Sequence, residues 1–294
     1  MKKAMIITTV LLVVSFITTL CLGAALGSQG LRALFRDGGV VDRWSQNLSD
    51  RADVSLYDED WDEEDRQYMF QSDSATLEGT PDTLTITTDV GNVRVRTSTG
   101  DAIEVVLEQY SRRSNPTSKY DFTVEGGNIV LTAADELDGT AATMTVYVPY
   151  ALASLSVESA LGNVEITGVT AASLSAHVDT GDLEVERVTT DTAQLRVELG
   201  ELDVDDSVAV SQSLTAETGS GNVNLELPAN APFALTYTVE TGSADIDEDI
   251  PTAWLREIQR NGVGAAGTLQ RDTGGAQYTV HVTLGSLELD RGGD

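Results

Sequence analysis

The chain has 294 residues, of which 47 are Asp or Glu and 18 are Lys or Arg, so its formal net charge is −29. A charge of this sign and size repels nucleic acid and anionic polymers, which argues against a nucleic-acid-binding protein. The single cysteine, Cys21, excludes a disulfide framework and a cysteine-based metal site.

The chain starts with Met1-Lys2-Lys3, and the run Ala4–Leu26 that follows carries no charged residue. A bilayer is spanned by about 20 apolar residues, so residues 1–27 are expected to be a membrane anchor. A cleaved signal segment is the alternative, because small residues near position 24 offer a cleavage site. The short tail before the span favours a cytoplasmic N-terminus, which places the rest of the chain outside the cytoplasm.

An acidic stalk is expected over residues 28–75. Residues 58–65, Asp-Glu-Asp-Trp-Asp-Glu-Glu-Asp, contain seven acids in eight positions. They lack the central glycine and the ordered alternation of an EF-hand calcium loop. A block of like charges is typical of a solvated spacer, so no calcium loop is predicted here.

A pattern of roughly 20 residues is repeated between Leu155 and Ile246. Each copy has an alternating run, a glycine turn and a second alternating run; the turn glycines are Gly162, Gly181, Gly200, Gly221 and Gly242. Mostly aliphatic residues recur five and three positions before the glycine, and two and four positions after it. An alternation of period two is typical of half-buried strands. One copy cannot bury its apolar face alone, but stacked copies form continuous aliphatic columns.

These columns predict an all-β fold, a β-solenoid with two short strands per coil and coils about 4.8 Å apart. The repeat domain is expected over residues 76–294, with regular coils over about 152–248. A β-sandwich of regular hairpins is the competing architecture.

Residues on either side of the regular coils depart from the repeat. Before them, a further copy lies at Gly91-Asn92-Val93 and a hairpin is expected over 122–131, a section that we expect to cap one end. After them, the insert 249–266 is expected to contain a helical turn over 254–258 and to pack on the last coils. A binding loop is the alternative, because Trp254 is its large aromatic residue. A last copy is expected over 278–289.

The repeats resemble a known family. The chain is similar to the putative-adhesin family of β-strand-repeat, LiaG-like bacterial proteins. The similarity lies in the sequence VPYALASLSVESALGNVEITGV (148–169), followed by VDTGDLEVERV and AETGSGNVNLEL. The resemblance covers about residues 82–294 and the N-terminal membrane segment. It implies a right-handed β-helix-like fold displayed outside the cell, with no enzymatic activity and no catalytic residues.

No catalytic motif is found in the sequence, and no cofactor is expected. His177 and His281, the two histidines, each occupy an outward strand position, which is typical of surface residues. The function expected is an adhesin-like binding or surface-display module, with a cell-wall, polysaccharide or protein ligand. The alternatives are an envelope-stress accessory or sensor that acts through a membrane partner, a self-assembling structural solenoid, and a polysaccharide-active β-helix enzyme. The enzyme is the weakest of these, because the repeats offer few cations and aromatic residues to hold a sugar.

Two outward columns of the repeat are rich in oxygen ligands. They lie one and three positions after the turn glycines and contain Asp182, Glu184, Glu201 and Asp203. Like charges opposite one another on neighbouring strands destabilise a sheet. A solvated acidic face is one interpretation. The other is that these four residues bind calcium or another hard divalent cation between neighbouring coils, because such ions prefer carboxylate oxygens.

Overall fold

The computed structural model describes residues 67–77, 79–205, 207–260 and 262–293. In these ranges the regular structure is all β-strand apart from one short 3-10 turn, η2 (Thr252–Trp254). The expected membrane span, the acidic block 58–65 and most of the expected stalk lie outside the described residues. Within the described part, no helix has the length and apolarity that a membrane crossing requires.

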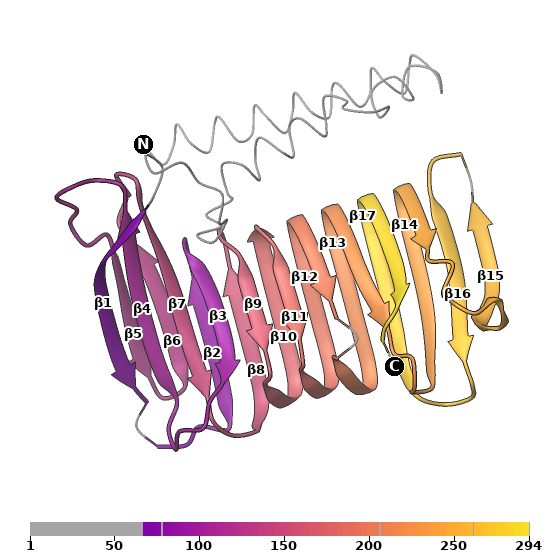
Figure 1. Ribbon diagram of the computed structural model, residues 1–294, viewed down its shortest axis with the longest axis horizontal. Coiled ribbons are helices and arrows are strands. Elements are labelled where there is room, and N and C mark those ends of the chain that lie inside the picture. Colours follow the sequence, from indigo (N-terminus) through magenta and orange to yellow (C-terminus); the bar gives the residue numbers. More distant parts are fainter. Residues whose placement is uncertain (1–66, 78, 206, 261, 294) are drawn as a thin grey trace, which may run out of the picture. The chain divides into compact units, whose positions relative to one another are not determined.

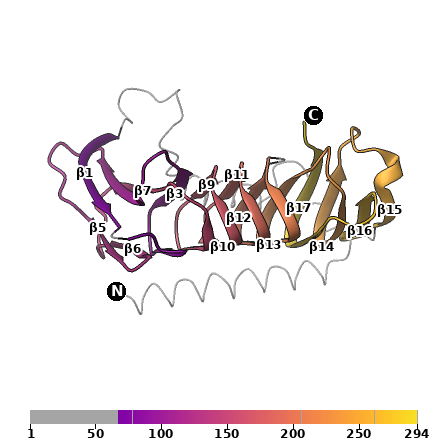
Figure 2. The ribbon, with the colours of Figure 1, turned by 90° about the horizontal axis from the view of Figure 1, so that it is seen from below.

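The strands form two layers, sheet A and sheet B, which face each other along the stack (Figures 1 and 2). Sheet A contains, in spatial order, β5 (Tyr120–Glu125), β6 (Asn128–Ala133), β2 (Thr83–Thr88), β8 (Leu152–Ser159), β10 (Thr170–Thr180), the first halves of β12 (Thr189–Val204), β13 (Ala209–Leu227), β17 (Ala276–Arg291) and β14 (Phe233–Ile246), then β16 (Ala265–Arg271) and β15 (Leu255–Arg260). Sheet B contains β1 (Tyr68–Thr76), β4 (Glu104–Ser111), β7 (Thr140–Val148), β3 (Asn92–Thr97), β9 (Val164–Thr167), β11 (Leu183–Glu186) and the second halves of β12, β13, β17 and β14.

Neighbouring coils pair in parallel and in phase, as the solenoid prediction requires. Val185 on β11 pairs with Val204 on β12, and both side chains are fully buried. A second inward column crosses six coils through Val157, Ala176, Leu195, Ala216, Val280 and Tyr237. Alanines pair with Leu195 on both sides of this column. Parallel pairing of successive coils is incompatible with a sandwich of antiparallel hairpins, so that alternative is wrong.

The turn glycines form a ladder at one edge of the stack. In spatial order its members are Gly91, Gly162, Gly181, Gly200, Gly221, Gly285 and Gly242. A Cβ added at Gly221 would lie 1.7 Å from the carbonyl oxygen of Gly200, and one at Gly242 would lie 1.6 Å from that of Gly285. Gly221 also has a φ of +143°, a conformation that L side chains rarely adopt. The turn between the sheets therefore requires glycine for both its backbone conformation and its close approach to the next coil.

The order of the last coils differs from the sequence order. β17, the final copy, lies between β13 and β14, and pairs in parallel with both. The last copy in the sequence therefore lies between the fourth and fifth copies. The glycines and aliphatic positions of all copies are in phase, so the repeat pattern allows several orders. The connections between the strands decide among them.

Antiparallel strands cover three of the four sheet ends. Sheet B begins with β1 and β4, and sheet A begins with the β5–β6 hairpin, which confirms the expected cap. β1 starts at Tyr68, inside the range expected to be stalk. At the other end, β16 and β15 extend sheet A beyond β14.

The prediction of a helical turn over 254–258 is wrong, because only Trp254 of these residues lies in a helical turn. η2 ends at Trp254, and residues 255–260 are strand β15. β15 pairs with β16, which itself pairs with β14, so the insert continues sheet A instead of forming a helix. Pairing at the sheet edge satisfies the backbone groups of residues whose apolar spacing, read alone, suggests a helix.

Candidate functional site

The structure places the four carboxylates of the predicted cation site on adjacent coils of sheet B. Glu184 on β11 lies directly opposite Asp203 on β12, and both side chains are exposed. Asp182 and Glu201 precede the same two strand segments, one residue after their turn glycines. The sequence therefore places these four residues together on one outward surface.

One of the two columns has a structural role that the sequence analysis missed. An Asn or Asp one residue after the glycine accepts, through Oδ1, a hydrogen bond from the backbone N–H of the equivalent residue in the next coil. Asn92 accepts from Asn163 at 3.0 Å, Asn163 from Asp182 at 3.0 Å, and Asp182 from Glu201 at 2.9 Å. Asp182 thus uses one carboxylate oxygen to join two coils, as its asparagine neighbours do. The recurring Gly-Asn pair at 91–92, 162–163 and 221–222 is the signal in the sequence that indicates this ladder.

Glu201 interrupts this ladder because its side chain is one carbon longer. Its carboxylate accepts instead from the side-chain amide of Asn224, which lies on the next coil. The ladder resumes at Asn222, whose Oδ1 accepts from the backbone N–H of Ser286 at 3.3 Å.

The second column concentrates negative charge in the middle of sheet B. At its first acidic member the charge is neutralised, because Arg94 and Arg96 bind Glu165 at 3.2 and 2.6 Å. Around Glu184 the described residues give no ion pair with a cation: partial desolvation of the carboxyl, a hydrogen bond with Glu186 and the charges of Glu186, Glu165 and Asp203 raise its pKa to about 7.

Asp203 has a raised pKa for similar reasons, first desolvation and then the charges of Glu201, Asp205 and Glu186. Glu186 is a further acidic residue that the sequence analysis did not single out, although it follows Glu184 at the same period of two. The charge therefore extends beyond the four residues predicted.

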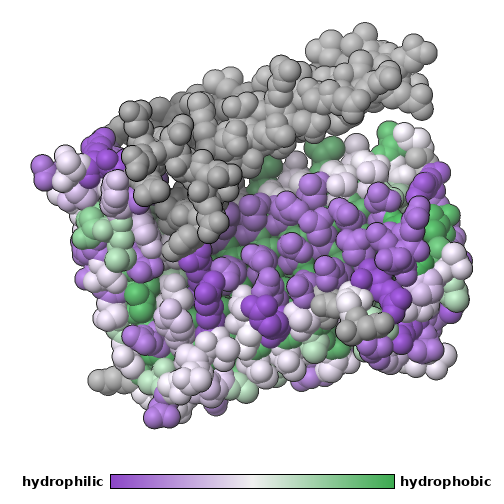
Figure 3. Space-filling view, viewed as in Figure 1, coloured by the Kyte–Doolittle hydropathy of each residue, from purple (hydrophilic) through white to green (hydrophobic). Residues whose placement is uncertain are grey.

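We call the outward acids on or beside the central strands of sheet B the acidic face; they are Glu165, Asp182, Glu184, Glu186, Glu201, Asp203, Glu226, Asp245, Glu288 and Asp290. Figure 3 shows a broad hydrophilic patch over the central coils. In the described residues, no group of three or more His, Cys, Asp or Glu is arranged to hold a metal ion. The arrangement present is an extended, flat surface of strong negative potential.

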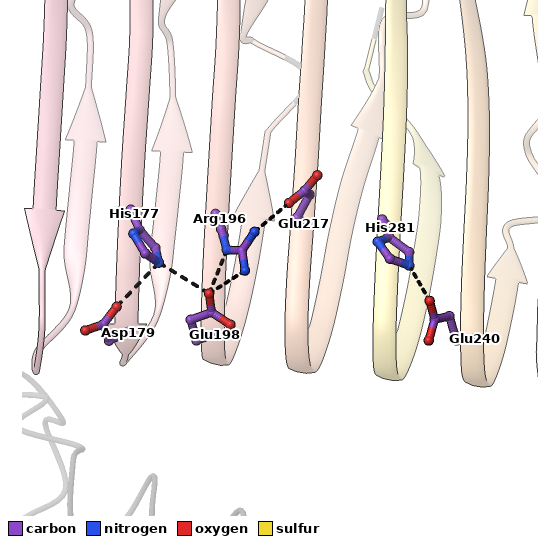
Figure 4. Close-up of polar contacts among 7 residues, drawn as sticks. All are labelled: His177, Asp179, Arg196, Glu198, Glu217, Glu240 and His281. Atoms are coloured by element: carbon purple, nitrogen blue, oxygen red, sulfur yellow. Dashed lines mark hydrogen bonds and ion pairs between the residues drawn. The ribbon is translucent and has the colours of Figure 1, made fainter.

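Sheet A presents a different outward surface, with hydroxyl side chains and one charged row. Figure 4 shows the charged row. In this row Arg196 binds Glu198 at 2.6 Å and Glu217 on the next coil at 3.1 Å. His177 lies 3.4 Å from Asp179 and 3.6 Å from Glu198, and His281 lies 3.0 Å from Glu240. Both histidines are half-exposed, as the outward strand positions predicted. Exposed pairs of this kind contribute little to stability, about 0–1 kcal/mol each.

Trp254 packs against the end of the core. Its ring meets Phe233 edge-on at 5.5 Å, and the guanidinium of Arg271 lies 5.3 Å from its centroid. Phe233 also meets Tyr278 at 5.9 Å, so the insert joins an aromatic cluster that closes the last coils. These contacts favour the expectation that residues 249–266 pack on the last coils over the binding-loop alternative.

Comparison with known proteins gives the family. The model described as Toastrack DUF4097 matches residues 81–211 and 150–289. A search of the curated proteins finds no match to the chain. Among solved structures, the chain is similar to a putative cell adhesion protein from Clostridium sporogenes, with 9% identity, 75% of this chain and 99% of that chain covered, and a TM-score of 0.37. It is also similar to a putative adhesin from Bacteroides fragilis, with 15% identity, 74% and 97% covered, and a TM-score of 0.42.

The two matched ranges of the family model overlap and together span the stack from β2 to β17. The resemblance that the repeats indicate is therefore confirmed at the level of the family. The chain belongs to the DUF4097 family of Toastrack proteins.

Proposed function

We propose that this chain is a non-enzymatic, adhesin-like display and binding module, held at the cell membrane by Ala4–Leu26 with its strand stack outside the cytoplasm. The observation that carries the proposal is the acidic face, a flat surface that repeats the same outward positions over consecutive coils of a rigid stack. Solenoid proteins use extended surfaces of this kind to bind partners.

The charge of the acidic face favours a class of ligand. The electrostatic potential of clustered carboxylates attracts cationic surfaces and repels anionic ones. A basic protein surface or another cationic component of the cell envelope suits this face better than an anionic polysaccharide. Because the acids are exposed, attraction to such a partner is screened by salt within about 8 Å at physiological ionic strength.

The two histidines take part in surface ion pairs. His177 and His281 lie on the outward surface of sheet A, and among the described residues each contacts carboxylates.

The membrane topology is tested on whole cells. Protease added to intact, wall-stripped cells is expected to remove the strand stack of the full-length protein. Survival of the stack while a known external protein is digested would reverse the proposed orientation.

Binding is tested with two variants of equal charge. The first replaces Glu184, Glu186 and Asp203 with Gln, Gln and Asn, and the second replaces the exposed Glu125, Glu136 and Glu158 with Gln. The purified full-length protein is incubated with isolated cell-wall material and with wall-stripped cells at low and high salt. Salt-sensitive binding that only the first variant loses is expected. Equal binding by both variants would exclude the acidic face as the binding surface.

A further inference from the structure

β17 occupies a slot between two strands that follow one another in the sequence. It pairs in parallel with β13 from Gln277 to Arg291, and with β14 from Ala276 to Leu289. Gly285 lies in register with Gly221 on one side and with Gly242 on the other. The same segment thus completes both sheets at once.

The slot accepts only a strand with the pattern of this repeat. A Cβ on Gly285 would lie 1.7 Å from the carbonyl oxygen of Gly221, so the centre of the strand must be glycine. Val280, Val282, Leu287 and Leu289 are fully buried on either side of that glycine. A strand that fits therefore needs glycine at its centre and aliphatic residues at these four positions, which a second copy of this chain provides.

The hinge that leads into β17 is short and strained. β16 and β17 lie on opposite sides of β14, so the four residues 272–275 must pass the start of that strand. Asp272 has a φ of +57°, which is unusual for a residue other than glycine. Gly275 passes so close to Pro232 that a Cβ on it would lie 1.9 Å from the Pro232 carbonyl oxygen. Short hinges under strain favour the exchange of the element that they connect.

We propose that two copies of this chain exchange β17, so that residues 276–291 of each copy fill the slot between β13 and β14 of the other. Every contact of β17 is the same in the exchanged pair, because the slot and the strand are identical in both copies. Only the hinge changes, and an extended hinge relieves the positive φ of Asp272. The result is a dimer joined by strand addition on both sides of each inserted strand. This inference does not depend on the ligand or the membrane topology proposed above.

The test uses cysteine pairs across the edge of the slot. Thr215 on β13 lies opposite Thr279 on β17, and both point outward on sheet A. Neighbouring strands are about 4.8 Å apart, so a short bis-maleimide joins cysteines at these positions. Two differently tagged full-length chains, one with Thr215→Cys and one with Thr279→Cys, are co-expressed with Cys21→Ser in both and treated with the reagent. The matched control replaces Thr215→Cys with Thr85→Cys, which lies on the same sheet surface but beside β8 and β6.

A crosslinked pair carrying both tags, at a yield several times that of the control, is expected if β17 is exchanged. The double variant Thr215→Cys/Thr279→Cys carries both cysteines, so its crosslink, within one chain or between two, reports whether the two positions react. Efficient crosslinking within that single chain, with no mixed pair above the control, would show that β17 stays in its own copy and would overturn the proposal. If the double variant gives no crosslink, either within one chain or between two, the register of β17 on which the proposal depends is wrong, and the proposal fails with it.

Discussion

The glycine ladder makes a demanding prediction about stability. Replacing Gly221 with alanine puts a methyl group 1.7 Å from the carbonyl oxygen of Gly200, whereas ordinary contact begins at 3.4 Å. The two coils would have to separate locally by about 1.7 Å, more than a third of a strand spacing of about 4.8 Å. A shift of that size breaks the inter-coil hydrogen bonds beside the turn.

The cost can be estimated from its parts. Two or three lost hydrogen bonds cost about 1 kcal/mol each, and a positive φ at alanine costs about 1–2 kcal/mol. The free energy of unfolding should therefore fall by about 3–5 kcal/mol, which lowers Tm by roughly 10 °C in a domain of this size. A loss of this size is a large part of a typical stability of about 5–15 kcal/mol.

Gly139→Ala is the control for backbone conformation. Gly139 also has a positive φ, +74°, but nothing lies within 4 Å of an added Cβ. Its replacement should cost only about 1–2 kcal/mol. Both variants and the parent protein are melted under one set of conditions and followed by circular dichroism. Equal losses for Gly221→Ala and Gly139→Ala would show that the close approach of the coils has no energetic weight, and would refute the reasoning.

Three further predictions concern sheet B. Val204→Asp buries an unpaired carboxylate in a fully buried column and should lower Tm strongly, whereas the outward Asp203→Asn should be neutral or slightly stabilising; similar melts would contradict the register. Because the pKa of Glu184 is raised in the folded chain, protonation of Glu184 stabilises the fold; this stabilisation is complete below about pH 4.5 and is lost as the pH rises through about 7. The free energy of unfolding should therefore fall from pH 5 to pH 8. Glu184→Gln should flatten that fall, whereas the exposed Glu136→Gln should not. If the predicted cation site exists, millimolar calcium should raise Tm more than sodium chloride of equal ionic strength, and Glu184→Gln/Asp203→Asn should abolish the difference; equal stabilisation by both salts would leave only screening.

The sequence by itself determined the coil and the environment of its side chains. The period of two assigns Val185 and Val204 to the core and Glu184 and Asp203 to the surface, because successive residues of a strand point to opposite faces. The fixed distance of these positions from each turn glycine also determined the parallel register, since a slip of one residue would expose an entire aliphatic column. The same reasoning identified a surface on which acids of adjacent coils lie together.

Only the tertiary structure decided the order of the coils and the environment of individual charges. Gly285 and Gly242 carry the same pattern, so the repeat does not determine which of them follows Gly221. The crossover at 272–275 decides this, because it carries β17 past β14 into the slot beside β13. In the same way, Asp182 and Glu184 are both outward acids in the sequence, but one accepts a backbone hydrogen bond from the next coil and the other lies among carboxylates that raise its pKa. These differences arise from contacts between coils, which the alternation of apolar and polar residues within each coil does not specify.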